Sequence, residues 1–263
     1  MIDVDLIVIG GVGFTNSEKL SFGSNGYEMK KIETPYGTTL VHIFETIGLR
    51  IAIIPRHFGT NHVPPHNINY RANIWATKSF ACNRVLALNS VGTMNEIKNL
   101  PGTFFIPNDF IDYTKSRIYT FFDEKTVHLD MTDPYCAQMR SKLNSFLGNL
   151  GTKFSEGTYV CTEGPRFETK AEIKMLQQFG DVVGMTGIPE VILAREIGLC
   201  YCSICTVTNY ACGISTNKLT IDEVIENIEQ SKDTLAEIIL HMAKQSDTIK
   251  ICACQNSIDG ATL

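Results

Sequence analysis

The sequence predicts an α/β fold: a single domain over residues 1–263, built as a three-layer sandwich with a mixed, twisted β-sheet between helices. The main observation is that strand-like runs at 157–161, 181–185 and 200–207 alternate with two helix-like runs. This β-α-β-α-β order is typical of a sheet covered by helices. The second observation is composition, since 44% of the residues are hydrophobic and 19% are charged, as in a globular protein with a sizeable core.

Start and stop signals bound the two helices between these strands. Thr169 and Glu172 form a capping box, in which each side chain bonds a backbone N–H that the helix leaves without a partner. Gly180 follows the first helix at a place where a left-handed residue is common. Pro189 suits the first position of the second helix, because its φ is fixed and it lacks an N–H. Gly198 closes that helix.

Polar residues follow each of the three strands. Glu163 and Glu168 come after the first, Thr186 after the second, and Thr208 and Asn209 after the third. In open α/β sheets, ligands bind at the carboxyl ends of the strands. We therefore expect a carboxylate, a hydroxyl and an amide to meet at one binding site.

The N-terminal part predicts further strands and an anion site. A strand at 5–9 feeds a glycine turn at 10–13, whose backbone N–H groups can form an anion-binding nest. The turn is neither G-x-G-x-x-G nor a P-loop, so dinucleotide and Walker motifs are absent. A hairpin is expected from 27–32 and 38–44, and a buried strand at 51–54. That strand delivers Arg56 and His57, and a guanidinium fork matches phosphate geometry.

The rest of the chain alternates in the same way. We expect a helix at 67–79, strands at 84–88 and 103–110, and a long functional loop at 112–134. An amphipathic helix follows at 136–147. The last helix begins after a second capping box at Thr220 and runs to about Met242, with an apolar stripe of Ile221, Val224, Ile225 and Ile228.

Charge and cysteine usage exclude several classes of function. The net charge of −5 gives no basic surface for nucleic acid, and no apolar run is long enough to span a bilayer. The acidic start lacks a signal peptide, so a soluble cytoplasmic protein is expected. Cys202 and Cys205 lie three apart on a strand and point to opposite faces, so we expect reduced core thiols and no metal site. Cys252 and Cys254 would share one face of a strand, where the pair could be redox-active, but an ordinary surface segment is favoured.

Several segments resemble a known family. EGPRFET, VVGMTGIPEV and VTNYACG look like signature blocks of the trimeric purine nucleoside phosphorylase and methylthioadenosine phosphorylase family. The likeness continues at DLIVIGGVG, IIPRH, PPHNINYRANIW and NSVGTM, and it covers the chain from about Asp5 to Met242. The resemblance implies phosphorolysis of a purine nucleoside, with phosphate as co-substrate and no cofactor. It also implies a homotrimer or a dimer of trimers.

The resemblance assigns roles to residues at the matching positions. Phosphate would be held by the backbone at Gly13 and by Arg56, His57, Ser90 and Thr186.

The same resemblance assigns the nucleoside contacts. Phe167 would stack on the base, Met185 would contact the ribose, and Asn209 would bond purine N7 as charge develops there. The pair of Glu168 and Asn209 resembles that of the 6-oxopurine enzymes.

The 5′ end of the sugar divides the candidate substrates. Ile221, Val224 and Ile225 match the positions that line the 5′ pocket, and their apolar character favours S-methyl-5′-thioinosine. His128, reaching in from a neighbouring subunit, would instead supply a polar contact for inosine or guanosine. The resemblance also leaves open a methylthioadenosine phosphorylase and a nucleoside-binding protein without catalysis. Val12, where the family often has Thr, and a longer loop after His57 support the binding protein, while a Rossmann dehydrogenase is disfavoured by the glycine pattern.

Overall fold

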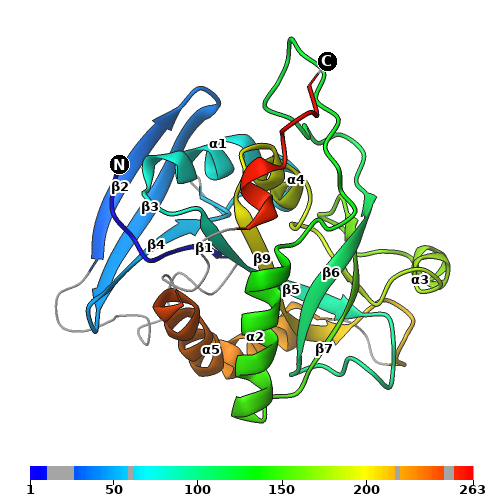
Figure 1. The fold of residues 1–263 in the computed structure, drawn as a ribbon. Helices are drawn as coiled ribbons and strands as arrows, with labels where there is room; N and C mark the ends of the chain where they lie inside the picture. Colours follow the sequence, from blue (N-terminus) through cyan, green and yellow to red (C-terminus); the bar gives the residue numbers. More distant parts are fainter. Residues whose placement is uncertain (11–26, 59–61, 217–219, 246–251, 263) are drawn as a thin grey trace.

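One mixed β-sheet forms the centre of the fold (Figure 1), seen in a computed structural model that describes residues 1–10, 27–58, 62–216, 220–245 and 252–262. Gly13 and Val12 lie outside these ranges. The described strands run in the order β2-β3-β4-β1-β5-β8-β7-β6-β9. They are β1 (Leu6–Gly10), β2 (Tyr27–Thr34), β3 (Gly37–Thr46), β4 (Leu49–Pro55), β5 (Arg84–Thr93), β6 (Phe104–Tyr113), β7 (Phe154–Thr162), β8 (Val182–Gly184) and β9 (Cys200–Tyr210). The α-helices are α1 (Tyr70–Trp75), α2 (Ala137–Leu150), α3 (Lys170–Leu176), α4 (Glu190–Glu196) and α5 (Ile221–Lys244).

Strand β5 is the branch point of the sheet. It pairs in parallel with β1 and with β9, and its last residues pair antiparallel with β8. Because β9 also pairs with β6, the strands β5, β8, β7, β6 and β9 close into a ring. The predicted mixed α/β sheet is confirmed, and the ring closure is a feature that the sequence pattern did not reveal.

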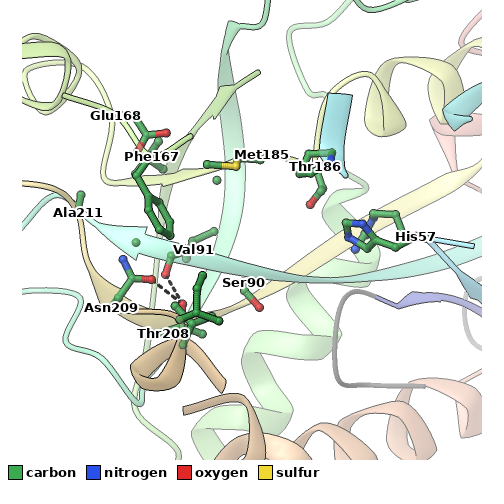
Figure 2. Close-up of a pocket in the computed structure, with 17 residues that line it drawn as sticks. His57, Ser90, Val91, Phe167, Glu168, Met185, Thr186, Thr208, Asn209 and Ala211 are labelled. Carbon is green, nitrogen blue, oxygen red and sulfur yellow. Dashed lines mark hydrogen bonds between the residues drawn. The ribbon is translucent and has the colours of Figure 1, made fainter. Parts of the chain in front are cut away.

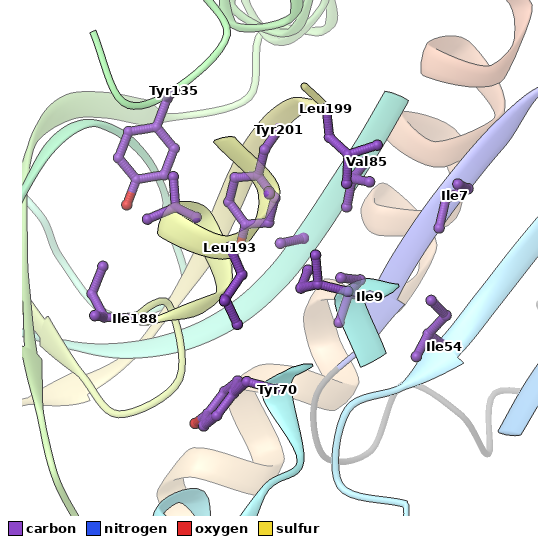
Figure 3. Close-up of a cluster of buried hydrophobic side chains, with 14 of the residues drawn as sticks. Ile7, Ile9, Ile54, Tyr70, Val85, Tyr135, Ile188, Leu193, Leu199 and Tyr201 are labelled. Carbon is purple, nitrogen blue, oxygen red and sulfur yellow. The ribbon is translucent and has the colours of Figure 1, made fainter. Parts of the chain in front are cut away.

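Helices cover both faces of the sheet, as expected for an α/β sandwich. Ile7 and Ile9 of β1 pack into a buried cluster with residues of α1 and α4 (Figure 3). The alternate residues Leu6 and Val8 pack into a second cluster with residues of α2 and α5. Successive strand residues point to opposite faces, so a strand buried on both faces reads as a continuous apolar run.

Two predicted helix ends are confirmed and two need correction. The capping box of Thr169 and Glu172 is present, and Gly198 adopts a left-handed φ of 72°. Gly180 is not left-handed. It is needed for space, because a Cβ there would lie 2.3 Å from Cγ2 of Val160. Pro189 is the N-cap residue of α4 and not its first helical residue.

The helix expected at 67–79 is broken into three pieces. A 3-10 turn at Pro65–Asn67 precedes α1, and a second one at Ala76–Ser79 follows it. The side chain of Asn69 accepts a hydrogen bond from the N–H of Ala72 and starts α1 at Tyr70. Ile68 has extended backbone angles and ends the first piece, and the N-cap Asn69 separates it from α1.

The cysteines follow one prediction and overturn another. Cys202 and Cys205 are buried free thiols in different clusters on opposite faces of β9, as predicted. The segment around Cys252 and Cys254 is not an exposed strand. It enters a 3-10 helix at Ala253–Asn256, and Cys254 is 5% exposed.

None of the helices in the described ranges combines the length and the apolar character needed to span a bilayer.

Candidate active site

A pocket opens where several strands end in the ring of the sheet (Figure 2). Strands β4, β5, β8 and β9 contribute their carboxyl-terminal residues, and the loop after β7 and the start of α5 close the sides. The pocket is lined by Arg56, His57, Pro65, Ser90, Val91, Gly92, Phe167, Glu168, Val183, Gly184, Met185, Thr186, Thr208, Asn209, Ala211, Ile221 and Val224. The sequence placed a binding site at these strand ends, and the structure brings them together.

Ser90 and Gly92 are directed to the pocket by the geometry of β5. Ser90 is exposed, whereas the other nine residues of the strand are buried, because its side chain faces the open pocket. Gly92 lies against the amide of Asn209, and a Cβ on Gly92 would be 2.8 Å from Asn209 Nδ2. Only a residue without a side chain leaves the amide in place.

Arg56 is buried, and its guanidinium fork faces a carboxylate. Arg56 Nε donates to Glu190 Oε1 at 2.7 Å and Nη2 donates to Oε2 at 2.9 Å. Nη2 also donates to Asn89 Oδ1, and Nη1 donates to the Leu88 carbonyl, each at 2.8 Å. Tyr201 donates to Glu190 Oε2 at 2.8 Å. The expected bidentate grip on phosphate is therefore corrected: the fork holds Glu190.

The ion pair with Glu190 limits the charge and the number of N–H donors that Arg56 can present to a ligand. Burial disfavours its charge, but the Glu190 carboxylate outweighs this and raises the pKa of Arg56. A guanidinium has five N–H donors. Within the described residues, one Nη1 hydrogen is left for the pocket. Sequence reasoning missed Glu190, although a carboxylate directly after Pro189 in a buried stretch needs a partner.

His57 is neutral in the free protein. Its pKa is lowered to about 4, mainly by burial; the bond to the Val63 carbonyl opposes this shift, and the nearby Arg56 charge adds to it. Its Nδ1 lies 2.7 Å from the Val63 carbonyl, so Nδ1 carries the hydrogen. The ring stacks on His62 with centroids 4.4 Å apart. Nε2 is then an acceptor, and His57 donates to an anion only after gaining a proton.

Tyr159 holds the turn that carries Thr186. Its hydroxyl accepts hydrogen bonds from the N–H groups of Thr186 and Gly187, each at 3.2 Å. Burial raises the pKa of Tyr159 far above its ordinary value, so the hydroxyl stays neutral. Tyr159 lies on β7, and nothing in the sequence linked it to the turn after β8.

Glu168 and Asn209 each keep one polar atom for a ligand. Glu168 Oε1 accepts from the Thr162 hydroxyl at 2.7 Å, which leaves Oε2. Asn209 Oδ1 accepts from the Thr208 hydroxyl at 2.8 Å, and Nδ2 donates one hydrogen to the Tyr210 carbonyl at 2.9 Å. Both side chains are less than 10% exposed. The network fixes the amide with one N–H still to donate.

The apolar side of the pocket comes from Phe167 and from the start of α5. Figure 2 shows the Phe167 ring beside Glu168 and directed toward Val91, and Phe167 is 37% exposed. Ile221 is 59% exposed at the rim, with Val224 beside it in the lining.

Two predicted residues of the 5′ site are not in this lining. Ile225 is 47% exposed on α5 outside it. His128 is exposed, and its backbone N–H donates to the Ala261 carbonyl at 2.8 Å, beside the C-terminal segment. Within one chain, the structure does not bring His128 to the pocket.

Arg117 is a buried residue that sequence reasoning missed. It anchors the loop after β6 by donating to the Glu163 carbonyl at 2.8 Å and to the Tyr70 hydroxyl at 3.1 Å. It also pairs with the Glu163 carboxylate at 3.4 Å and bonds the Ile188 carbonyl. The long loop is therefore pinned beside the segment that carries Phe167 and Glu168.

The fold and the pocket are typical of an α/β enzyme with a small-molecule site at the carboxyl ends of its strands. Compared with known protein families, residues 5–244 of the chain match the phosphorylase superfamily. The chain belongs to the phosphorylase superfamily and is an enzyme of the nucleoside phosphorylase type, a class of pentosyltransferases.

Relatives with a curated name cover nearly the whole chain. A protein of Methanosarcina acetivorans named "Probable S-methyl-5'-thioinosine phosphorylase" is 46% identical over 259 residues, 98% of this chain and 97% of that protein. The 6-oxopurine nucleoside phosphorylase of Pyrococcus furiosus is 40% identical, with 98% of each chain covered.

Solved structures show the same fold. A methylthioadenosine phosphorylase from an antarctic soil metagenomic library superposes with a TM-score of 0.89 at 30% identity, covering 100% of this chain and 93% of that one. Methylthioadenosine phosphorylase from Schistosoma mansoni in complex with adenine gives a TM-score of 0.88 at 29% identity, over 98% and 99% of the two chains.

Proposed function

We propose that this protein cleaves S-methyl-5′-thioinosine with phosphate, giving hypoxanthine and 5-methylthioribose 1-phosphate. The observation that carries the proposal is the contrast between two parts of the pocket lining. Glu168 and Asn209 present one acceptor and one donor, and Ile221 and Val224, at the start of α5, present an apolar rim.

The polar side suits a 6-oxopurine. Hypoxanthine has a donor at N1–H and acceptors at O6 and N7, which complement Glu168 Oε2 and the remaining N–H of Asn209. Adenine would direct the lone pair of N1 at the carboxylate. A site built on hydrogen bonds rejects such a partner strongly, because its buried polar groups are left unpaired.

The apolar rim suits a methylthio group. A 5′-hydroxyl buried against Ile221 and Val224 without a partner would cost roughly 1–3 kcal/mol. A methylthio group would instead gain about 25 cal/mol for each Å² of apolar surface that it buries. Ile221 is 59% exposed in the free chain, so it has surface to bury.

In the proposed reaction, phosphate attacks the anomeric carbon while the bond to the purine nitrogen breaks. The electron pair of that bond moves onto the base, where the Asn209 N–H meets the growing charge on N7. Such an interaction strengthens in the transition state. Holding phosphate against the sugar can lower the activation free energy by roughly 7–11 kcal/mol in well-oriented systems. Phosphate and nucleoside are the only reactants required.

Phosphate would lie among Ser90, Thr186 and His57, with the backbone at Gly13. The remaining Nη1 hydrogen of Arg56 would reach it, and the paired guanidinium would supply orientation more than net charge. A phosphate dianion beside His57 would favour the protonated imidazole, because an opposite charge stabilises the charged form.

We also propose that the chain assembles as a trimer in which the exposed loop carrying His128 meets a neighbouring pocket. If His128 supplies a polar contact to the 5′ end there, ordinary inosine or guanosine becomes the better substrate. The 40% identity to a 6-oxopurine nucleoside phosphorylase supports this second candidate.

The test is kcat/KM for S-methyl-5′-thioinosine, inosine and methylthioadenosine at saturating phosphate, with the released base measured by chromatography. We expect the first substrate to exceed the other two. A ratio to inosine at or below one leaves the 6-oxopurine activity and removes the methylthio preference. Faster cleavage of methylthioadenosine removes the base assignment.

Matched variants test the rim separately. Ile221→Asn should lower the preference for methylthioinosine over inosine, because it offers a hydroxyl a partner and costs the thioether apolar contact. Ile97→Asn is the control, since Ile97 is 88% exposed and outside the pocket lining. An unchanged ratio in Ile221→Asn would remove this residue from the 5′ site.

A further inference from the structure

Four cysteine sulfurs meet at a place that the proposed reaction does not use. The Sγ atoms of Cys136, Cys200, Cys252 and Cys254 all lie within 4.8 Å of one another. Cys136 precedes α2, Cys200 begins β9, and the other two belong to the C-terminal segment. Three separate parts of the chain therefore converge on one point.

The spacing of the sulfurs fits a metal ion better than it fits disulfides. In a tetrahedral zinc site with Zn–S bonds of about 2.3 Å, neighbouring sulfurs lie about 3.8 Å apart. Here Cys136 Sγ lies 3.5 Å from Cys252 Sγ, which lies 3.3 Å from Cys254 Sγ. A disulfide would need about 2.05 Å. Since all the sulfurs lie within 4.8 Å of one another, changes of no more than about 1 Å in these distances accommodate the ion.

The surroundings favour a closed, structural site. Cys136, Cys200 and Cys254 are buried in the apolar cluster between the sheet and helices α2 and α5. Cys136 is the N-cap residue of α2, a helix of 14 residues, and its N–H is bonded to the Tyr201 carbonyl at 2.8 Å. The positive end of a helix dipole stabilises negative charge such as that of a zinc thiolate.

We propose that Cys136, Cys200, Cys252 and Cys254 bind one zinc ion tetrahedrally. Four protein ligands leave no open position, so the ion is structural and not catalytic. Thiolate sulfur selects zinc over the hard cations, which prefer oxygen. Binding releases the thiol protons, so uptake of zinc acidifies an unbuffered solution.

The site would fasten the C-terminal segment to the body of the protein. It lies at the amino end of β9, whereas Asn209 is at the opposite end of the strand. The segment beyond it bonds the long loop, since Val127 bridges Thr262 and His128 N–H donates to Ala261. The ion would thereby help to hold the long loop at Val127 and His128.

The first experiment uses the full-length protein purified without chelator or reductant. Elemental analysis should give close to one zinc per chain, the stoichiometry of a four-cysteine site. After denaturation with a chelator, thiol titration should count all nine cysteines. A chain with no zinc, with iron in its place, or with two or four thiols missing as disulfides overturns the proposal. Replacement by cobalt should give the visible bands of a tetrahedral tetrathiolate.

The second experiment compares variants. Cys252→Ser/Cys254→Ser should lose zinc and melt several degrees below the wild type, because an ion that binds only the folded state stabilises it. Cys82→Ser is the control, since Cys82 is partly buried outside the cluster, and it should keep its zinc. Zinc retained by the double variant overturns the proposal. If that variant does not fold, the zinc content and cobalt spectrum of the wild type decide.

Discussion

Replacing Glu190 by glutamine should destabilise the protein far more than the change of one atom suggests. The Glu190 carboxylate is 0% exposed and accepts two hydrogen bonds from Arg56 and one from Tyr201. Arg56 and Tyr201 are each 1% exposed, so bulk water cannot replace a hydrogen bond that any of the three groups loses.

The magnitude follows from counting donors. Each carboxylate oxygen accepts from Arg56, so the amide nitrogen of a glutamine would face an arginine N–H in either orientation. The variant also leaves the guanidinium charge buried without its counter-ion. Breaking one partner of a buried ion pair costs about 3–5 kcal/mol. By contrast, Tyr201→Phe removes one neutral donor from the carboxylate and should cost about 1–2 kcal/mol.

The measurement is the free energy of unfolding from urea denaturation, followed by circular dichroism at pH 7.5 in phosphate-free buffer. We expect Glu190→Gln to lose at least twice as much stability as Tyr201→Phe, with similar m-values. A loss below about 1 kcal/mol in Glu190→Gln would contradict the buried ion pair. Arg56→Ala should lose as much as Glu190→Gln, and the double variant Arg56→Ala/Glu190→Gln should recover part of that loss.

Three further predictions concern the pocket. Because burial holds the pKa of His57 at about 4, below the 6.5 of an unfolded histidine, the unfolded chain takes up this proton first as pH falls. Stability is therefore lost as the pH falls from about 6.5 to 4, by about 2 kcal/mol between pH 7.5 and 5; urea denaturation of His57→Gln should show a correspondingly smaller loss. Gly92→Ala should lower kcat at least tenfold in the phosphorolysis assay with little change in melting temperature, because its Cβ would displace the Asn209 amide; unchanged kcat contradicts this positioning. Asn209→Asp should raise the adenine-to-hypoxanthine nucleoside ratio of kcat/KM, because the new carboxylate oxygen accepts from the 6-amino group of adenine and repels O6 of hypoxanthine; an unchanged ratio contradicts the contact between Asn209 and the base.

The position of the pocket could be predicted from the sequence because it follows from local pattern. Strands show as apolar runs, and polar residues directly after them collect at one edge of the sheet. Thr186 and Asn209 were placed at that edge on this basis, and both line the pocket. The opposite facing of Cys202 and Cys205 follows equally from the two-residue period of a strand.

Partners that lie far apart in the chain could not be predicted. Arg56 and Glu190 are separated by 134 positions, and Cys136 and Cys252 by 116. Their contacts depend on the order of strands in the sheet, which a single sequence does not specify. The guanidinium was therefore assigned to phosphate, and the Cys252 segment to the surface. The sequence does hold one signal for each contact: Glu190 and Cys200 both lie in apolar segments, where a carboxylate or a reactive thiol indicates a partner elsewhere in the chain.

A bulge in β9 explains why the Asn209 amide is directed so specifically toward the pocket. The pairing with β5 runs from Val91 with Val207 directly to Gly92 with Asn209, so Thr208 is the extra residue. A bulge leaves one residue unpaired and re-aims the side chain beside it. Thr208 has no partner residue in β5, and its hydroxyl donates to Asn209 Oδ1 at 2.8 Å. Gly92 leaves space for the Nδ2 of the same amide. The irregularity of the strand and the glycine opposite it thus act as one device, since neither alone would fix the amide with a free N–H toward the pocket.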